Sequence, residues 1–382
     1  MTRLLLSAGE ASGDVHGADL ARALAAQAPG VQLFGMGGPM MAAAGVELLY
    51  NPTSLSTVGF LEALKSVRVL RRVLARLSAA MDERRPDGVV CIDFPGFNLR
   101  LAALAHRKGI PVLYYFSPSA WAWGRGRAAQ LARLGATILA VFPFEAEVYR
   151  AAGAPVVFVG HPLVDRVRPS AGREDIRAEL GVPPGGTLVA LLPGSRRQEL
   201  ESLLPAMLAA ARIIRDQRPG ARFVLPMAYT LAADEVQRMV QASGVPVTVM
   251  AGRAYDVLHA ADGALISMGT ATLEAALLGV PHVACYRVSR ITYKLVQLLV
   301  HVRHFAMPNI ILGRAAVPEL IQDQVTGENL ARELLALLAP ERAAALRAEL
   351  AQVRAQLGEG GAVARAAAAV LARVAPGAAG RA

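Results

Sequence analysis

The chain of 382 residues is 54% hydrophobic, 18% charged and 5% aromatic, and it contains two cysteines. This composition excludes a disordered, collagen-like or disulfide-rich protein, and the length favours about two or three domains. Forty Lys and Arg residues against thirty Asp and Glu residues give a formal net charge of +10. Such a charge indicates an acidic partner: a nucleic acid, an anionic membrane surface or a phosphorylated substrate.

The apolar runs and the cysteines predict where the protein resides. The N-terminus lacks the apolar core of a signal peptide, and no uncharged apolar run reaches the about 18 residues of a membrane span. Cys91 and Cys285 lie far apart in apolar runs, as buried reduced thiols do. We therefore expect a cytoplasmic protein, with membrane contact that is at most peripheral.

The first half of the chain alternates short apolar runs with helical patterns. Strands are expected at 4–8, 31–35, 88–92, 111–116, 137–141 and 156–159, with helices such as 20–26 and 99–107 between them. This alternation predicts an α/β fold with a doubly wound parallel sheet.

The first turn between strand and helix reads Gly-Glu-Ala-Ser-Gly-Asp at 9–14. Its glycines permit close backbone approach, and a helix N-terminus favours an anion. Glu10 and Asp14, however, would repel a pyrophosphate, so we expect an acceptor-side or structural loop. Its candidate residues are Glu10, Ser12, Gly13 and Asp14.

A basic amphipathic helix is expected at 55–74, where apolar residues recur at helical spacing among Lys and Arg. Two interpretations are open. The helix could lie on an anionic membrane through Phe60, Leu61 and Leu64, or it could face the core and expose a solvated basic side.

Asp93 ends the buried run 88–92, so its carboxylate is expected at the carboxyl edge of the sheet, where open α/β sheets bind ligands. A general base and a structural turn or helix cap are equally compatible with this position. Asn98 could cap the following helix. Further along, Ser117 precedes Trp121 and Trp123, whose rings suit either sugar or acyl contacts or plain wall packing.

A polar stretch rich in Pro and Gly at 160–174 is the expected interdomain linker. A second strand series follows at 187–192, 222–226, 246–250, 263–267 and 281–286, and the tail after 332 is helical. We expect two Rossmann-like domains across a cleft, at 1–165 and 166–340, with the helices of 341–382 packing back on the first.

Two turns of the second half suit phosphate. Ser195 and Arg196 follow one strand, and Gly269 and Thr270 follow another, with Glu274 one helical turn later. A guanidinium can bind phosphate with two hydrogen bonds, helix N–H groups favour a diphosphate, and a carboxylate can accept from ribose hydroxyls. Together they predict a nucleotide site, with no metal-binding acidic pair.

Six motifs follow one another along about residues 3–325, in the order found in one known family. They lie at 9–14, 92–98, 117–123, 193–196, 269–274 and at Met-Pro-Asn 307–309. With them, the chain resembles the lipid-A-disaccharide synthase family of GT-B glycosyltransferases (family 19). It departs at Gly96, where many relatives carry a second Asp, and at Met268, where a Ser commonly precedes Gly-Thr.

The resemblance implies the transfer of 2,3-diacylglucosamine from UDP-2,3-diacylglucosamine to the 6-hydroxyl of 2,3-diacylglucosamine 1-phosphate, with inversion and with neither metal nor cofactor. It implies the acceptor on the N-terminal domain, the donor on the C-terminal one and Asp93 as the general base. Arg196, Gly269 and Thr270 would hold the diphosphate and Glu274 the ribose. Asn309, Glu319 and Gln322 would line the donor side. Because both substrates carry acyl chains, the resemblance also implies peripheral association with the inner face of the cytoplasmic (inner) membrane.

Other functions remain open at this point. A UDP-N-acetylglucosamine 2-epimerase or a peptidoglycan glycosyltransferase would share the fold. A nucleic-acid-binding protein would explain the charge, but the basic residues are scattered and no recognition module is present, so only non-specific binding is expected. A membrane-associated scaffold without activity and a homo-oligomer are also compatible with the sequence.

Overall fold

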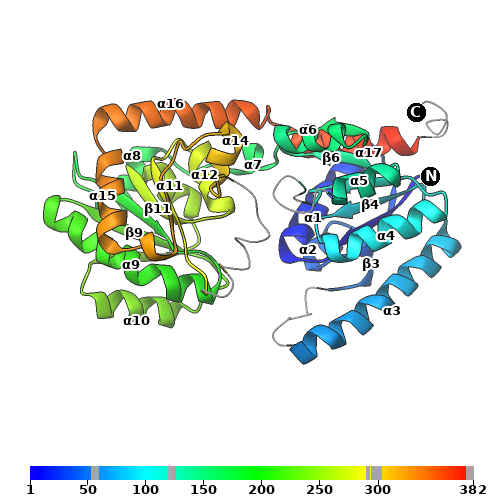
Figure 1. The fold of residues 1–382 in the computed structure, drawn as a ribbon, viewed down its shortest axis with the longest axis horizontal. Coiled ribbons are helices and arrows are strands. Elements are labelled where there is room, and N and C mark those ends of the chain that lie inside the picture. Colours follow the sequence, from blue (N-terminus) through cyan, green and yellow to red (C-terminus); the bar gives the residue numbers. More distant parts are fainter. Residues whose placement is uncertain (53–59, 119, 121–125, 290–292, 294–302, 376–382) are drawn as a thin grey trace. The chain divides into compact units, whose positions relative to one another are not determined.

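The computed structural model describes residues 1–52, 60–118, 120, 126–289, 293 and 303–375, with the side chains of 60–67 outside this description (Figure 1). The chain forms two compact units, Met1–Pro162 with Leu357–Ala382, and Leu163–Gln356. The first unit is therefore discontinuous in sequence.

Within the described residues, the first unit contains a seven-stranded parallel sheet with the strand order β3-β2-β1-β4-β5-β6-β7. Its strands are β1 (Arg3–Ala8), β2 (Gln32–Met36), β3 (Glu47–Tyr50), β4 (Gly88–Ile92), β5 (Val112–Tyr115), β6 (Thr137–Ala140) and β7 (Val156–Phe158). Its helices are α1 (Ala11–Gln27), α2 (Pro39–Ala43), α3 (Phe60–Arg84), α4 (Pro95–Arg107), α5 (Gly126–Arg133), α6 (Pro143–Ala151) and α17 (Ala362–Val374). The expected doubly wound sheet is confirmed.

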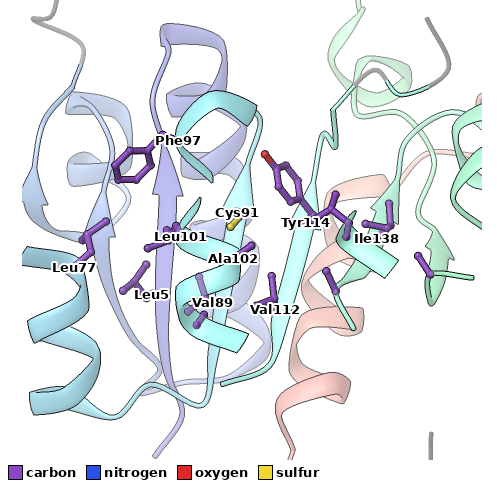
Figure 2. Packing of buried hydrophobic residues seen from close by; sticks show 14 of the residues in the cluster. Leu5, Leu77, Val89, Cys91, Phe97, Leu101, Ala102, Val112, Tyr114 and Ile138 are labelled. Carbon is purple, nitrogen blue, oxygen red and sulfur yellow. The ribbon is translucent and has the colours of Figure 1, made fainter. Parts of the chain in front are cut away.

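Two hydrophobic clusters cover the two faces of this sheet, because alternate strand residues point to opposite sides. On one face, Leu5 and Val89 of the strands pack with Leu77 of α3 and Leu101 of α4, all of them fully buried (Figure 2). On the other face, the strands pack with α1 and α17. Full burial of such a side chain stabilises the fold by about 1.5–3 kcal/mol. The two clusters therefore hold the strands of this sheet firmly in place.

The second unit contains, among the residues described, a six-stranded parallel sheet with the order β10-β9-β8-β11-β12-β13. Its strands are β8 (Leu188–Leu192), β9 (Arg222–Met227), β10 (Val247–Ala251), β11 (Gly263–Ser267), β12 (His282–Tyr286) and β13 (Glu319–Ile321). Its helices are α7 (Leu163–Arg166), α8 (Arg173–Glu179), α9 (Arg197–Gln217), α10 (Ala233–Ser243), α11 (Ala254–Ala260), α12 (Thr270–Leu277), α14 (Met307–Leu312), α15 (Gly327–Leu337) and α16 (Pro340–Gln356), with a 3-10 turn at Gln322–Gln324.

The C-terminal helices divide between the units. α16 packs against α12, α14 and α15 of the second unit, whereas α17 packs against α1 of the first. The chain crosses into the second unit after Pro162, within the polar stretch at 160–174, and returns at Leu357. Cys91 and Cys285 are free and buried, as their apolar surroundings predict.

Candidate functional site

Asp93 lies directly after β4, at the carboxyl edge of the first sheet, and its side chain is half-buried. Asp93 and Phe94 both adopt a φ of +48°, in the left-handed region. A non-glycine residue in this region destabilises the fold by about 1–3 kcal/mol, so it is found only where the surrounding structure enforces it. Burial raises the pKa of Asp93, and the negative charge of Glu10 raises it further.

Two buried donors hold the backbone of this residue. The carbonyl oxygen of Asp93 accepts a hydrogen bond from the Asn98 amide at 2.8 Å and one from the Tyr114 hydroxyl at 2.9 Å. Asn98 is fully buried, and its oxygen accepts from the Ser7 hydroxyl at 2.6 Å. Asn98 therefore supports the Asp93 turn from beneath, and Tyr114, which sequence reasoning missed, does the same. A tyrosine within a buried strand carried no signal of this role.

The turn at 9–14 packs against the Asp93 turn. A Cβ atom on Gly9 would lie 2.1 Å from the Phe94 ring, so only glycine fits this approach. Glu10 precedes α1 and is exposed, as is Ser12, whereas Gly13 is buried against Ala8. The turn thus brings the Glu10 carboxylate close enough to affect the ionisation of Asp93.

The Asp14 carboxylate points to a different element. It is almost fully buried and accepts hydrogen bonds from the backbone N–H groups of Gly38 at 2.8 Å and of Met40 and Met41 at 3.0 Å. These N–H groups belong to the start of α2, where a helix leaves donors without partners of its own. Asp14 therefore fixes α2 against α1.

The chain after β5 is anchored by α6. The Ser117 hydroxyl donates to the Glu145 carboxylate, which also accepts from the backbone N–H groups of Val141 and Phe142. Burial raises the pKa of Glu145, and these hydrogen bonds oppose that change. Tyr149 donates to the carbonyl oxygen of Pro118 at 2.8 Å. Trp121 and Trp123, the next candidates, lie outside the described residues.

A pocket of about 790 Å³ lies at the carboxyl edge of the second sheet, where β8, β9 and β11 end. This volume is typical of small-molecule sites. Five residues predicted from the two phosphate-suited turns line it together: Ser195, Arg196, Gly269, Thr270 and Glu274.

The turn after β8 is shaped by Glu199, which also lines the pocket. Its carboxylate accepts from the backbone N–H groups of Ser195 at 3.0 Å and Arg196 at 3.2 Å. Gly194 adopts a φ of +115°, and a Cβ atom there would lie 2.2 Å from that carboxylate. The Arg196 guanidinium lies 3.5 Å from the other oxygen of the Glu199 carboxylate, and 81% of the Arg196 side chain is exposed. Sequence reasoning missed Glu199, although its place three residues after Arg196 is a helix-capping signal.

Within the lining of this pocket, the Tyr255 hydroxyl donates to Glu274 at 3.1 Å. Burial raises the pKa of Glu274, while that hydrogen bond and the positive charge of Arg166 lower it. Gly269 has a φ of +151° and precedes α12, whose N-terminus opens on the pocket. Tyr255 and Arg168 are further lining residues without a sequence signal.

Three donor-side candidates are not among the residues that line this pocket. Asn309 is fully buried and donates to Glu319 at 2.8 Å. Glu319 also accepts from the N–H groups of Phe305 and Ala306, just before α14. Gln322 binds the backbone of Val288 in both directions. These residues therefore brace the chain around α14 and the end of β12.

The side chains of Phe60, Leu61 and Leu64 lie outside the description, although their backbone begins α3. Farther along α3, Val73 and Leu77 are buried in the core, whereas Arg68, Arg71, Arg72 and Arg76 are exposed. No helix in the described parts of the chain is long and apolar enough to span a membrane. Among the same residues, no three His, Cys, Asp or Glu side chains gather as metal ligands would.

Comparison with solved structures supports the fold. A UDP-GlcNAc 2-epimerase from Neisseria meningitidis bound to UDP-GlcNAc has a TM-score of 0.64 at 12% identity, with coverage of 97% of this chain and 100% of that one. The calicheamicin glycosyltransferase CalG4 has a TM-score of 0.62 at 18% identity, with coverage of 98% and 100%. Identities this low establish the fold alone: two Rossmann-like units of the GT-B type.

Sequence comparison is more specific. The family model described as lipid-A-disaccharide synthetase matches residues 4–372. A lipid-A-disaccharide synthase of Geobacter sulfurreducens is 44% identical over 370 residues, 97% of this chain and 96% of its own length. One from Myxococcus xanthus is 42% identical over 379 residues, 98% of both chains. The resemblance seen in the motifs is thereby confirmed, and the chain belongs to the lipid-A-disaccharide synthase family.

Proposed function

We propose that this chain transfers 2,3-diacylglucosamine from UDP-2,3-diacylglucosamine to the 6-hydroxyl of 2,3-diacylglucosamine 1-phosphate, giving lipid A disaccharide 1-phosphate and UDP. The observation that carries the proposal is a half-buried carboxylate of raised pKa at the carboxyl edge of one sheet, in a chain whose other sheet has a pocket lined by phosphate-suited residues. Family membership supplies the identity of donor and acceptor.

Asp93 acts as the general base. It takes the proton of the acceptor 6-hydroxyl while that oxygen forms a bond to the anomeric carbon and the bond from that carbon to UDP breaks. Attack from the face opposite UDP inverts the configuration. A raised pKa suits this role, because a base works best when its pKa lies closer to the working pH.

The donor diphosphate is held by Arg196 and by the N-terminus of α12 at Gly269 and Thr270. Arg196 is exposed and can bind phosphate oxygens with two hydrogen bonds. The backbone N–H groups that begin a helix carry partial positive charge and stabilise the UDP leaving group. Glu274, oriented by Tyr255, accepts hydrogen bonds from the ribose.

Asn309, Glu319 and Gln322 act on the donor side through the backbone that they brace. The acceptor side is formed by Glu10, Ser12 and Ser117, together with Trp121 and Trp123. Asn98 and Asp14 support it through Asp93 and α2. The acyl chains of both substrates reside in a membrane, and α3 provides the contact with its cytoplasmic face.

The proposal is tested by measuring UDP release from UDP-2,3-diacylglucosamine in detergent micelles, with and without 2,3-diacylglucosamine 1-phosphate. We expect release only when the acceptor is present. A separate assay contains soluble UDP-N-acetylglucosamine as its only substrate. Its epimerisation, with no release from the acylated donor, would instead establish the epimerase alternative.

A further inference from the structure

A second cavity, of about 690 Å³, lies at the opposite edge of the second sheet, where its strands begin. Its lining comes from α8, the loop before β8, the chain between α9 and β9, Asp262 before β11, and the junction of α15 with α16. None of the residues described as lining it lines the carboxyl-edge pocket. It is therefore a separate site.

Four arginines line this cavity, and two of them have a structural role. Arg173 donates to the carbonyl oxygens of His259 and Ala261, and Arg177 donates to that of Ala260. Both also bind the Asp262 carboxylate, at 2.6 and 3.1 Å. These two arginines provide hydrogen-bond donors for the carbonyl groups at the end of α11. The single negative charge of Asp262 is already shared between them, so it does not neutralise the other arginines of the cavity.

Within the described part of the chain, the other two arginines, Arg218 and Arg347, have no such partners. Among the described residues, no carboxylate lies within 4.0 Å of either guanidinium, and the hydrogen bond of Arg218 to the Thr187 hydroxyl is long, at 3.5 Å. The acidic residues of the lining are Asp262 and the exposed Glu174. Four arginines against two carboxylates leave an excess of two positive charges around the hollow.

We infer that this cavity binds a phosphate-bearing anion. A phosphate monoester carries close to two negative charges at neutral pH, which matches the excess, and guanidinium groups bind phosphate oxygens in pairs of parallel hydrogen bonds. Pro183, Pro184 and Leu338 form an apolar part of the wall, against which the group that carries the phosphate would pack. A lipid headgroup and a soluble phosphorylated compound both have this chemistry.

The test compares a double variant, Arg218→Gln with Arg347→Gln, with a matched control, Arg212→Gln with Arg342→Gln. The control removes the same charge from exposed positions of α9 and α16 that do not line the cavity. Binding of inorganic pyrophosphate is measured by calorimetry on the full chain with UDP at saturation, because the proposed function places UDP in the carboxyl-edge pocket. We expect the double variant to bind pyrophosphate about tenfold more weakly than the control.

Cosedimentation with vesicles that contain phosphatidic acid, whose headgroup is a phosphate monoester, against phosphatidylcholine vesicles identifies the source of the phosphate. Loss of vesicle binding together with pyrophosphate binding assigns a lipid headgroup, and loss of pyrophosphate binding alone assigns a soluble compound. Equal pyrophosphate affinity in the double variant and the control would overturn the inference, as would no pyrophosphate binding by the unaltered chain. Unchanged UDP affinity in both variants establishes that they are folded.

Discussion

At the scale of single residues, the proposed chemistry depends on groups that do not touch substrate. The Asp93 backbone is held in a rarely adopted conformation by Tyr114 and Asn98. The direction of its carboxylate follows from that conformation. Because Tyr114 and Asn98 are buried beneath Asp93, their removal should affect the geometry of the base more than the binding of substrate.

Replacing Tyr114 with Phe removes one of the two hydrogen bonds to the Asp93 carbonyl. Such a bond contributes about 0.5–1.5 kcal/mol, so we expect kcat to fall up to about tenfold with little change in the KM for the donor. Tyr149→Phe, which loses a buried hydrogen bond to the Pro118 carbonyl, is the control for stability. If Tyr114→Phe loses as much stability as Tyr149→Phe but keeps its kcat, the role of Tyr114 is only structural.

Burial contributes most to the raised pKa of the proposed base Asp93, and Glu10 contributes next. Its negative charge disfavours the ionised form of Asp93 and so raises the pKa of Asp93. Glu10→Gln removes that charge, which lowers the pKa, so the acid limb of kcat/KM should move to lower pH. The profile is compared with that of Glu147→Gln, an exposed position on α6. An acid limb that stays in place or moves to higher pH contradicts the assignment.

At the scale of elements, polar side chains connect segments that lie far apart in the sequence. The Asp14 carboxylate on α1 accepts three backbone hydrogen bonds from the start of α2. A five-residue helix is too short to be stable without such contacts. The attachment of α2 therefore depends on one carboxylate.

Asp14→Ala leaves three N–H groups of α2 without their acceptor, and we expect it to lower the free energy of unfolding by about 1–3 kcal/mol. Urea unfolding measures the loss. Asp82→Ala, at an exposed position of α3, breaks a pair with Lys108 and should cost less than about 1 kcal/mol. Equal losses in the two variants would contradict the capping role of Asp14.

Helix α3 carries the proposed membrane contact. Serine at Phe60, Leu61 and Leu64 should reduce cosedimentation with anionic liposomes, because burial of apolar side chains contributes to interfacial binding. Val157→Ser, an exposed apolar position on β7, is the control. Liposome binding that is unaffected by the three serines while the fold is intact would count against a contact through α3.

The sequence predicted these elements unevenly. Strands with continuous apolar runs, such as β4 and β11, were found at their observed bounds because they are buried on both faces. β3 and β13 were missed, since one is a short edge strand and the other has only three residues. The motif at 88–98 predicted Asp93 at a strand end, but nothing in it indicated that Tyr114 holds its carbonyl, because the two residues meet only through strand pairing.

At the scale of the whole molecule, the chain divides the proposed chemistry between two units. The first carries Asp93, and the second carries the pocket with Arg196 and Glu274. The first unit is completed only by the C-terminus: α17 packs on α1, and Arg365 donates to the Val159 carbonyl at 2.9 Å. The last helix is therefore part of the fold that supports the base.

The most direct test of the account compares UDP release by the unaltered chain, Asp93→Asn and Asp87→Asn, with donor and acceptor in detergent micelles. Asp87 lies just before β4, at the other end of the strand that carries Asp93, and is exposed. We predict acceptor-dependent release that is lost in Asp93→Asn and kept in Asp87→Asn. Release that persists in a folded Asp93→Asn variant would contradict the role of Asp93 as the base.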